Sequence, residues 1–262
     1  MGSATTQALQ ATTAKLSTAS IGDLTVAREL FAAAREIADS PQLGGALSAW
    51  GAPGQARAAL VTTVFAGYSP VTLDLLATAA AQRWSSLGDL VSGVEELAIR
   101  AAAVATPGGD LEGELFQVAR TVATNPGLEL ALGSRLGDPA AKGALVEKLF
   151  SGRATDAATL VTAELVQQPR ERRVRSMMSR ALRIVADQRG RAVATVRVAH
   201  DLDAAQRERL GSALRERYGS DIALNVIVDP SVLGGVRIEI GDDVIDGTVS
   251  SRIKDLRQRL AG

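Results

Sequence analysis

Hydrophobic side chains recur every three or four positions through most of the chain that precedes residue 191. Between residues 24 and 38 the pattern runs through Ala27, Phe31, Ala34 and Ala38, and Pro41 follows it. This spacing places the apolar side chains on one face of a helix, and the proline predicts where that helix ends. Similar spacing predicts a short helix within residues 1–20 and further helices that begin near residues 59, 70, 90, 111, 139, 156 and 173.

After residue 191 the hydrophobic period shortens to two. Apolar and polar residues alternate in three segments, which predicts strands with one buried face. The segments are 192–199 (AVATVRVA), 222–228 and 236–240. Gly241-Asp242-Asp243 supplies the residues of a tight hairpin, which predicts a further short strand after it.

Two helices belong to this last part of the chain. Asp203 and Gln206 form a capping-box pattern that predicts the start of one helix, and Gly219 predicts its end. Apolar residues at helical spacing predict the other over 249–260. Together these elements predict a small α+β domain over 192–262, in the order β-α-β-β-β-α. Its core is expected around Ile238, Ile240, Ile253 and Leu256.

The helical part of the sequence repeats itself at a constant offset. When each position is compared with the one 85 positions later, Glu29-Leu30-Phe31 meets Glu114-Leu115-Phe116, and the other matches are mainly apolar residues and helix stops. Duplication of a helical bundle would preserve its core residues and helix ends, so the repeat predicts two bundles of the same kind. The helix 90–104 is expected to end the first bundle and to start the second. The predicted fold class is mainly α, with two tandem bundles before the α+β domain. The predicted domains are 5–105, 90–190 and 192–262.

Composition excludes several classes of protein. The chain is 46% apolar and 22% charged, as globular proteins are, and it contains no cysteine. Disulfides and thiolate metal sites are therefore impossible. No stretch approaches the roughly 20 apolar residues that span a bilayer as a helix.

No catalytic motif is present in the sequence. Phosphate-binding glycine loops and nucleophile elbows are both missing. The single histidine, His200, is expected at the surface. Asp242, Asp243 and Asp246 fit hairpin and helix-cap roles better than a calcium or magnesium site. Gly234-Gly235 indicates a close backbone approach rather than a phosphate cradle. We therefore expect a non-catalytic chain without cofactor or metal.

Positive charge concentrates in residues 170–191, although the whole chain has a formal net charge of zero. Three interpretations of this arginine-rich segment stay open. It is a solvated helix face, a contact surface for an acidic protein partner, or a nucleic-acid surface. The last is the weakest, because aromatic residues that stack on bases are missing there.

One long stretch carries a resemblance to a known family. Residues 229–253 read DPSVLGGVRIEIGDDVIDGTVSSRI, which closely resembles the C-terminal signature of the delta subunit of bacterial F-type ATP synthases. This is the family of the mitochondrial oligomycin-sensitivity-conferring protein. The signature positions, expected to be structural, are Asp229, Pro230, Leu233, Gly234, Gly235, Val236, Gly241, Asp246 and Gly247.

The resemblance implies a peripheral-stalk, or stator, subunit on the cytoplasmic side of the cell membrane. Proteins similar to this one bind N-terminal helices of the alpha subunits through their helical domain and the end of the b subunit through their C-terminal domain. They hold the catalytic head still while the rotor turns, contact the membrane only through the complex, and bind no nucleic acid. The alternative is a helical adaptor or nucleic-acid-binding scaffold that uses residues 170–191. Family members typically match residues 90–262, so the first bundle is extra.

The resemblance also implies where the alpha subunits bind. In the family, an alpha helix that is commonly acidic lies between the first and fifth helices of the bundle, which here are 90–104 and 173–188. The second of these carries Arg173, Arg180 and Arg183, whereas the corresponding helix of the first bundle carries Glu95 and Glu96. We therefore expect 90–190 to bind the alpha N-termini and the first bundle to brace the connection between stalk and head.

Overall fold

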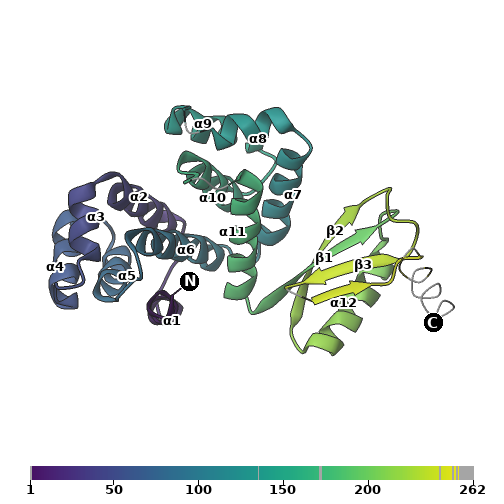
Figure 1. The fold of residues 1–262 in the computed structure, drawn as a ribbon, viewed down its shortest axis with the longest axis horizontal. Helices are drawn as coiled ribbons and strands as arrows, with labels where there is room; N and C mark the ends of the chain where they lie inside the picture. The colour runs from purple at the N-terminus through teal and green to yellow at the C-terminus, as the bar shows by residue number, and fades with distance from the viewer. Residues whose placement is uncertain are drawn as a thin grey trace. The chain divides into compact units, whose positions relative to one another are not determined.

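The computed structural model describes residues 2–134, 136–170, 173–241, 243–249, 251 and 253. The chain divides into two compact units, Met1–Val185 and Ala186–Gly262 (Figure 1). The first is helical and the second contains a sheet, so the chain is mainly helical with a C-terminal α+β part, as predicted. Within the described residues, no helix has the length and apolar character needed to cross a bilayer.

The helical unit consists of eleven helices within the described residues. They are α1 (Ser3–Ser17), α2 (Thr25–Asp39), α3 (Pro41–Ser48), α4 (Gly54–Val64), α5 (Pro70–Ala81), α6 (Leu87–Ala105), α7 (Leu111–Ala123), α8 (Pro126–Gly133), α9 (Pro139–Phe150), α10 (Asp156–Gln167) and α11 (Val174–Gln188). The segments with an apolar period of three or four are all helical. Two short helices, α3 and α8, were not predicted.

The prolines explain both omissions. Pro41 and Pro126 were expected only to end helices, but each is also the first residue of the next helix. A proline costs little there, because the first backbone N–H of a helix has no partner within the helix and the fixed φ suits it. At α3 the hydroxyl of Ser40 accepts a hydrogen bond from the backbone N–H of Leu43 at 3.2 Å, which caps the helix.

Helix α6 is buried on all its sides. Every residue from 93 to 103 is buried, and the helix packs against α1, α2, α3 and α5 on the N-terminal side and against α10 on the other. A helix that is buried all round must be apolar or small on most faces, and its charged side chains must be paired. Glu96 accordingly accepts a hydrogen bond from Arg100 at 2.8 Å. Gly93 shows how tight the packing is, because a Cβ there would lie 2.2 Å from the indole ring of Trp84.

Helices α2 to α6 form a first helical set, and α7 to α11 form a second. Corresponding helices of the two sets begin about 85 residues apart, which is the offset found in the sequence. Helix α3 spans 41–48 and α8 spans 126–133, while α4 begins at 54 and α9 at 139. Equivalent neighbours also pack together, since α4 contacts α5 as α9 contacts α10, and α2 contacts α5 as α7 contacts α10.

Two polar contacts recur in both sets. In the first set, the Glu29 carboxylate accepts hydrogen bonds from the backbone N–H (3.1 Å) and hydroxyl (2.7 Å) of Ser69, which caps α5. In the second, Glu114 accepts them from the N–H (3.2 Å) and hydroxyl (2.5 Å) of Thr155, which caps α10. Each set also buries one positively charged side chain that contacts backbone carbonyls. This side chain is Arg57 on α4 in the first set and Lys142 on α9 in the second.

The C-terminal unit is a four-stranded mixed sheet with one long helix. The strands are β1 (Arg191–Val198), β2 (Asp221–Val228), β3 (Val236–Ile240) and β4 (Asp243–Asp246), and helix α12 (Ala204–Tyr218) joins the first two. Their order in the sheet is β2-β1-β3-β4, with β1 parallel to β2 and antiparallel to β3. The predicted capping box at Asp203 and Gln206 is present, and Gly219 ends α12 in the left-handed conformation.

The core of this unit lies on one face of the sheet, where α12 supplies Leu214. Its other buried members are Ala194, Val196, Val198, Val226, Ile238 and Ile240. The prediction that Ile253 belongs to this core was wrong, because its side chain is 46% exposed. The apolar face of the sheet is instead packed with side chains of α12, among them Leu210 and Leu214. Leu256 lies outside the described residues.

Candidate functional site

The signature segment forms two loops that meet at one end of the sheet. Gly234 and Gly235 precede β3 with φ angles of +76° and +80°. The backbone N–H of Gly247, which follows β4, donates to the Val236 carbonyl at 2.9 Å, and that of Val249 donates to the Gly234 carbonyl at 3.2 Å. A Cβ at Gly235 would lie 2.4 Å from the Gly247 carbonyl oxygen. The double glycine therefore allows a close backbone approach.

Two signature aspartates fix these loops in the same way. Asp229 accepts hydrogen bonds from the hydroxyl (2.7 Å) and backbone N–H (2.9 Å) of Ser231. Asp246 accepts them from the hydroxyl (2.7 Å) and N–H (3.0 Å) of Thr248. The hydrogen bonds from Ser231 favour the charged carboxylate, so they lower the pKa of Asp229 below its ordinary value.

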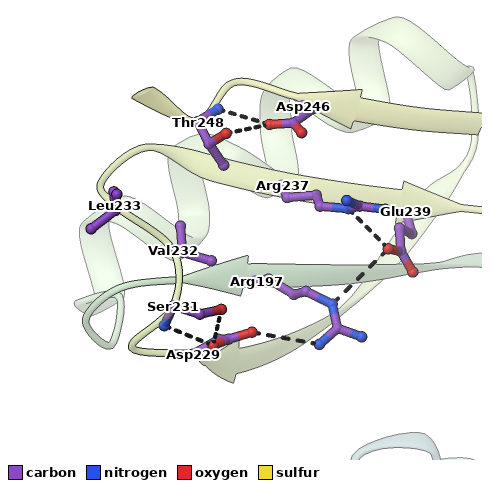
Figure 2. A pocket seen from close by; sticks show the side chains of 9 residues that line it. All are labelled: Arg197, Asp229, Ser231, Val232, Leu233, Arg237, Glu239, Asp246 and Thr248. Atoms are coloured by element: carbon purple, nitrogen blue, oxygen red, sulfur yellow. Dashed lines mark hydrogen bonds and ion pairs between the residues drawn. The ribbon is translucent and has the colours of Figure 1, made fainter. Parts of the chain in front are cut away.

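A cleft of about 400 Å³ opens between these loops and the face of the sheet opposite the core (Figure 2). Its lining residues are Arg197, Asp229, Ser231, Val232, Leu233, Arg237, Glu239, Asp246 and Thr248. Arg197, on β1, is 3.9 Å from the Asp229 carboxylate and 4.0 Å from that of Glu239. Arg237 donates to Glu239 at 3.2 Å. At the rim, Leu233 exposes 69% of its surface, which makes this a polar cleft with an apolar edge.

The structure brings together several residues that are distant in the sequence. The signature residues Asp229, Leu233 and Asp246 line the cleft, whereas Gly241 lies at the β3–β4 hairpin with a φ of +57°. Arg197 was not predicted as a site residue. The alternation of residues 192–199 already placed it on the polar face of its strand, but nothing in the sequence identified that face as the wall of a cleft.

The predicted arginine surface is only partly present. Arg173 and Arg183 are exposed. Arg180 is half-buried and donates to the Glu96 carboxylate on α6 at 2.9 Å. Arg180 and Glu96 therefore compensate each other's charge within the chain, and the interface at Arg173, Arg180 and Arg183 stays a prediction.

Two further arginines of this segment, Arg170 and Arg175, also lie beside carboxylates. Arg170 forms an ion pair with the buried carboxylate of Glu95 at 2.5 Å, and Arg175 lies 3.5 Å from Glu129. Charges that are compensated inside the protein attract phosphates weakly. This pairing leaves less uncompensated positive charge for a nucleic-acid surface over 170–191, with Arg173 and Arg183 still exposed.

The acidic hairpin residues also have structural contacts. The hydroxyl of Tyr218 at the end of α12 donates to the Asp243 carboxylate, and this hydrogen bond raises the pKa of Tyr218 above its ordinary value. Asp242 lies outside the described residues. In the described part of the chain, no group of three or more histidine, aspartate or glutamate side chains is arranged to hold a metal ion. His200 is exposed.

Comparison with known sequences identifies one family. Residues 100–260 match the family model described as ATP synthase delta (OSCP) subunit. ATP synthase subunit delta of Leifsonia xyli is 46% identical over 264 residues, which cover 100% of both chains. That of Streptomyces avermitilis is 40% identical over 213 residues, which cover 79% of this chain and 78% of the relative. A chain in the cryo-EM structure of the Toxoplasma gondii mitochondrial ATP synthase hexamer covers 63% of this chain and 96% of its own length, at 19% identity and a TM-score of 0.38.

Proposed function

The chain belongs to the ATP synthase delta (OSCP) subunit family, and from this premise we propose how its two units act in a stator. As a delta subunit it is a non-catalytic component of the peripheral stalk. The helical unit holds the N-termini of alpha subunits in the catalytic head, and the C-terminal unit holds the end of the b subunit. Holding both keeps the head from turning with the rotor during proton-driven ATP synthesis. The observation that carries the assignment is the full-length relative at 46% identity.

The complex places the chain at the cytoplasmic side of the cell membrane, attached only through its partners. Purification of the tagged chain from native membranes tests this. Alpha and b subunits are expected in the eluate at stoichiometric amounts, identified by mass. An eluate that lacks either subunit, in detergent that keeps the remaining complex intact, contradicts the proposal.

Within the helical unit, residues 90–190 bind the alpha N-termini beside α11. Arg173 and Arg183 are exposed there and supply rim charges for an acidic helix, while apolar contacts supply most of the affinity. Arg180 contributes indirectly, because its ion pair with Glu96 fixes α11 against α6. The first helical set braces the connection between stalk and head.

An alpha N-terminal peptide tests this surface. The double variant Arg173→Glu and Arg183→Glu should bind the peptide about tenfold more weakly at low salt, and the difference should shrink at high salt because rim charges are screened. The matched control is Arg28→Glu, an exposed arginine of α2, which should leave binding unchanged. Equal binding by all three proteins at low salt contradicts the placement of the interface at α11.

We also propose that the two helical sets descend from one duplicated unit. The constant sequence offset, the repeated helix packing and the two recurring polar contacts support this. An experimental structure tests it directly. Backbones 24–104 and 109–189 should superpose helix by helix, and a different order of helix packing in the two sets would contradict the duplication.

A further inference from the structure

The loop between α3 and α4 displays an exposed tryptophan. Trp50 leaves 68% of its surface open, whereas Trp84, the other tryptophan of the chain, is 5% exposed. The guanidinium of Arg83 lies over the Trp50 ring, 5.2 Å from its centroid, which is a cation–π arrangement. Tryptophan and arginine are among the residues most enriched at the energetic centres of protein interfaces. The pair is therefore a candidate anchor for a partner on the first helical set.

Arg57 fixes the two backbone segments that carry this pair. Its buried guanidinium donates to the Ala49 carbonyl at 3.3 Å, next to Trp50 in the chain. It also donates to the Gln82 carbonyl at 3.0 Å, next to Arg83. Because both segments are held by one buried donor, the anchor is arranged before a partner arrives. Such preorganisation lowers the entropic cost of binding.

The segments around the pair contain little negative charge. No aspartate or glutamate occurs in residues 40–73 or 75–88. Asp74, which lies between them on α5, is paired with Lys15 at 2.7 Å. Arg83 is exposed, and in the described part of the chain no carboxylate forms an ion pair with it. An uncompensated cation at an exposed anchor favours a partner that brings a carboxylate.

The second helical set shows which group the equivalent position contacts. Gln168 is the counterpart of Arg83 at the offset of 85 residues, and its side-chain amide donates to the Asp39 carboxylate at 3.0 Å. Asp39 is the last residue of α2, so the end of a helix from the other set supplies this carboxylate. In the first set the position holds an arginine, which binds a carboxylate more strongly than an amide does.

We propose that Trp50 and Arg83 form the docking site for a helix of another subunit of the complex, whose last turn carries an acidic side chain. The carboxylate pairs with Arg83 as Asp39 pairs with Gln168, and a neighbouring apolar side chain packs on the Trp50 indole. The inference rests on the proposed function, in which the first helical set braces the connection between stalk and head. It goes further by naming the anchor residues and the chemistry of their partner.

Hydroxyl-radical footprinting of the two tryptophans tests this proposal, with oxidation measured by mass spectrometry. In the free full-length chain Trp50 should be oxidised readily, and buried Trp84 serves as the internal reference. In the complex purified from native membranes, oxidation of Trp50 should fall about fivefold or more, because an anchor side chain at an interface is shielded from water. Equal oxidation of Trp50 in the free chain and in the complex overturns the inference.

The same assay tests the charge of the partner. Arg83→Glu sets a negative charge against the partner's carboxylate and should return Trp50 oxidation in the complex to the level of the free chain. Loss of this variant from the complex has the same meaning. Arg28→Glu, an exposed arginine of α2, is the matched control and should keep both assembly and protection. Low oxidation of Trp84 shows that each variant is folded. Protection that survives Arg83→Glu overturns the acidic partner.

Other occupants of this surface give different results. Protection of Trp50 in the free chain by phosphatidylglycerol vesicles indicates a lipid surface, and protection that rises with protein concentration indicates a second copy of this chain. Either result overturns the inference.

The outcomes also separate this inference from the stator assignment. If Trp50 stays exposed in a complex that contains alpha and b subunits, the inference fails while the stator assignment stands. If the chain purifies without alpha and b subunits, the proposed function itself is wrong.

Discussion

Arg57 and Lys142, at equivalent positions of the two helical sets, each hold the backbone that follows a short helix. Arg57 donates to the carbonyl of Ala49 at 3.3 Å, and Lys142 donates to the carbonyl of Ser134. Ala49 and Ser134 are also equivalent, and each is the residue after its short helix. Both cations are buried. The two helical sets thus share a buried cation that binds the backbone after the short helix. Comparison of apolar positions alone does not reveal this feature.

The first prediction compares these two cations. Arg57 also donates to the carbonyls of Ala52, Ala80, Ala81 and Gln82, whereas Lys142 donates to one carbonyl among the described residues. Replacing Arg57 by leucine leaves several buried acceptors without a donor and should lower the free energy of unfolding by about 3 kcal/mol or more. Lys142→Leu should cost about 1–2 kcal/mol. Urea unfolding measures both, and a larger loss for Lys142→Leu would contradict the assignment of roles.

A second prediction concerns two glycines that both have positive φ. Gly241→Ala should cost about 1–2 kcal/mol, because open space surrounds its position and only the left-handed conformation is unfavourable. Gly235→Ala adds a collision with the Gly247 carbonyl at 2.4 Å, so we expect a loss of about 3 kcal/mol or more. Urea unfolding followed by circular dichroism checks the order, and equal losses would mean that the loops do not meet this closely.

The third prediction is a pH dependence that arises from Asp229. Its folded-state pKa is lowered, so its contribution to stability is present above the ordinary aspartate pKa of about 3.9 and is lost as the pH falls through the folded value. Ser231→Ala removes the hydroxyl donor, the largest cause of the shift. NMR titration of the side-chain carboxyl should show the Asp229 pKa rising toward its ordinary value in this variant. An unchanged pKa would show that the Ser231 hydroxyl does not stabilise the carboxylate.

The fourth prediction separates two arginines of α11. Arg180→Gln breaks the ion pair with the buried Glu96 carboxylate and should destabilise the helical unit by about 1–2 kcal/mol, a value reduced because Arg180 is partly exposed. Arg183→Gln changes an exposed side chain and should stay within about 0.5 kcal/mol of the unaltered protein. Thermal unfolding of the two variants gives the comparison. A loss of stability in Arg183→Gln and none in Arg180→Gln would contradict the assignment of Arg180 as the structural arginine.

Local sequence patterns accounted for most of the secondary structure. The capping box at Asp203 and the left-handed Gly219 depend only on residues near them in the chain, so they could be predicted. The short helices after Pro41 and Pro126 were missed because each proline was interpreted only as a helix stop. Ser40-Pro41 and Asn125-Pro126 also carry a helix-start signal, a cap residue followed by proline at the first helical position.

Only part of the candidate site could be predicted from the sequence. The signature loops could be recognised as a continuous stretch, but Arg197 comes from a separate, earlier strand and reaches the cleft through the pairing of β1 with β3. Arg180 was misread for a related reason. Its spacing on the helix indicated an exposed face, and its partner Glu96 lies on α6, far away in the sequence. Long-range pairing of charges leaves no periodic signal in either segment.

Because α6 is buried on every side, the first helical set is difficult to gain or lose in a single evolutionary step. Removing residues 1–85 would uncover the faces of α6 that pack against α1, α2, α3 and α5. That fragment would expose an apolar surface of the kind that promotes aggregation. A chain that loses the first set must therefore acquire polar residues along α6 at the same time. The role of this set is best probed by changing its surface residues while its fold is kept whole.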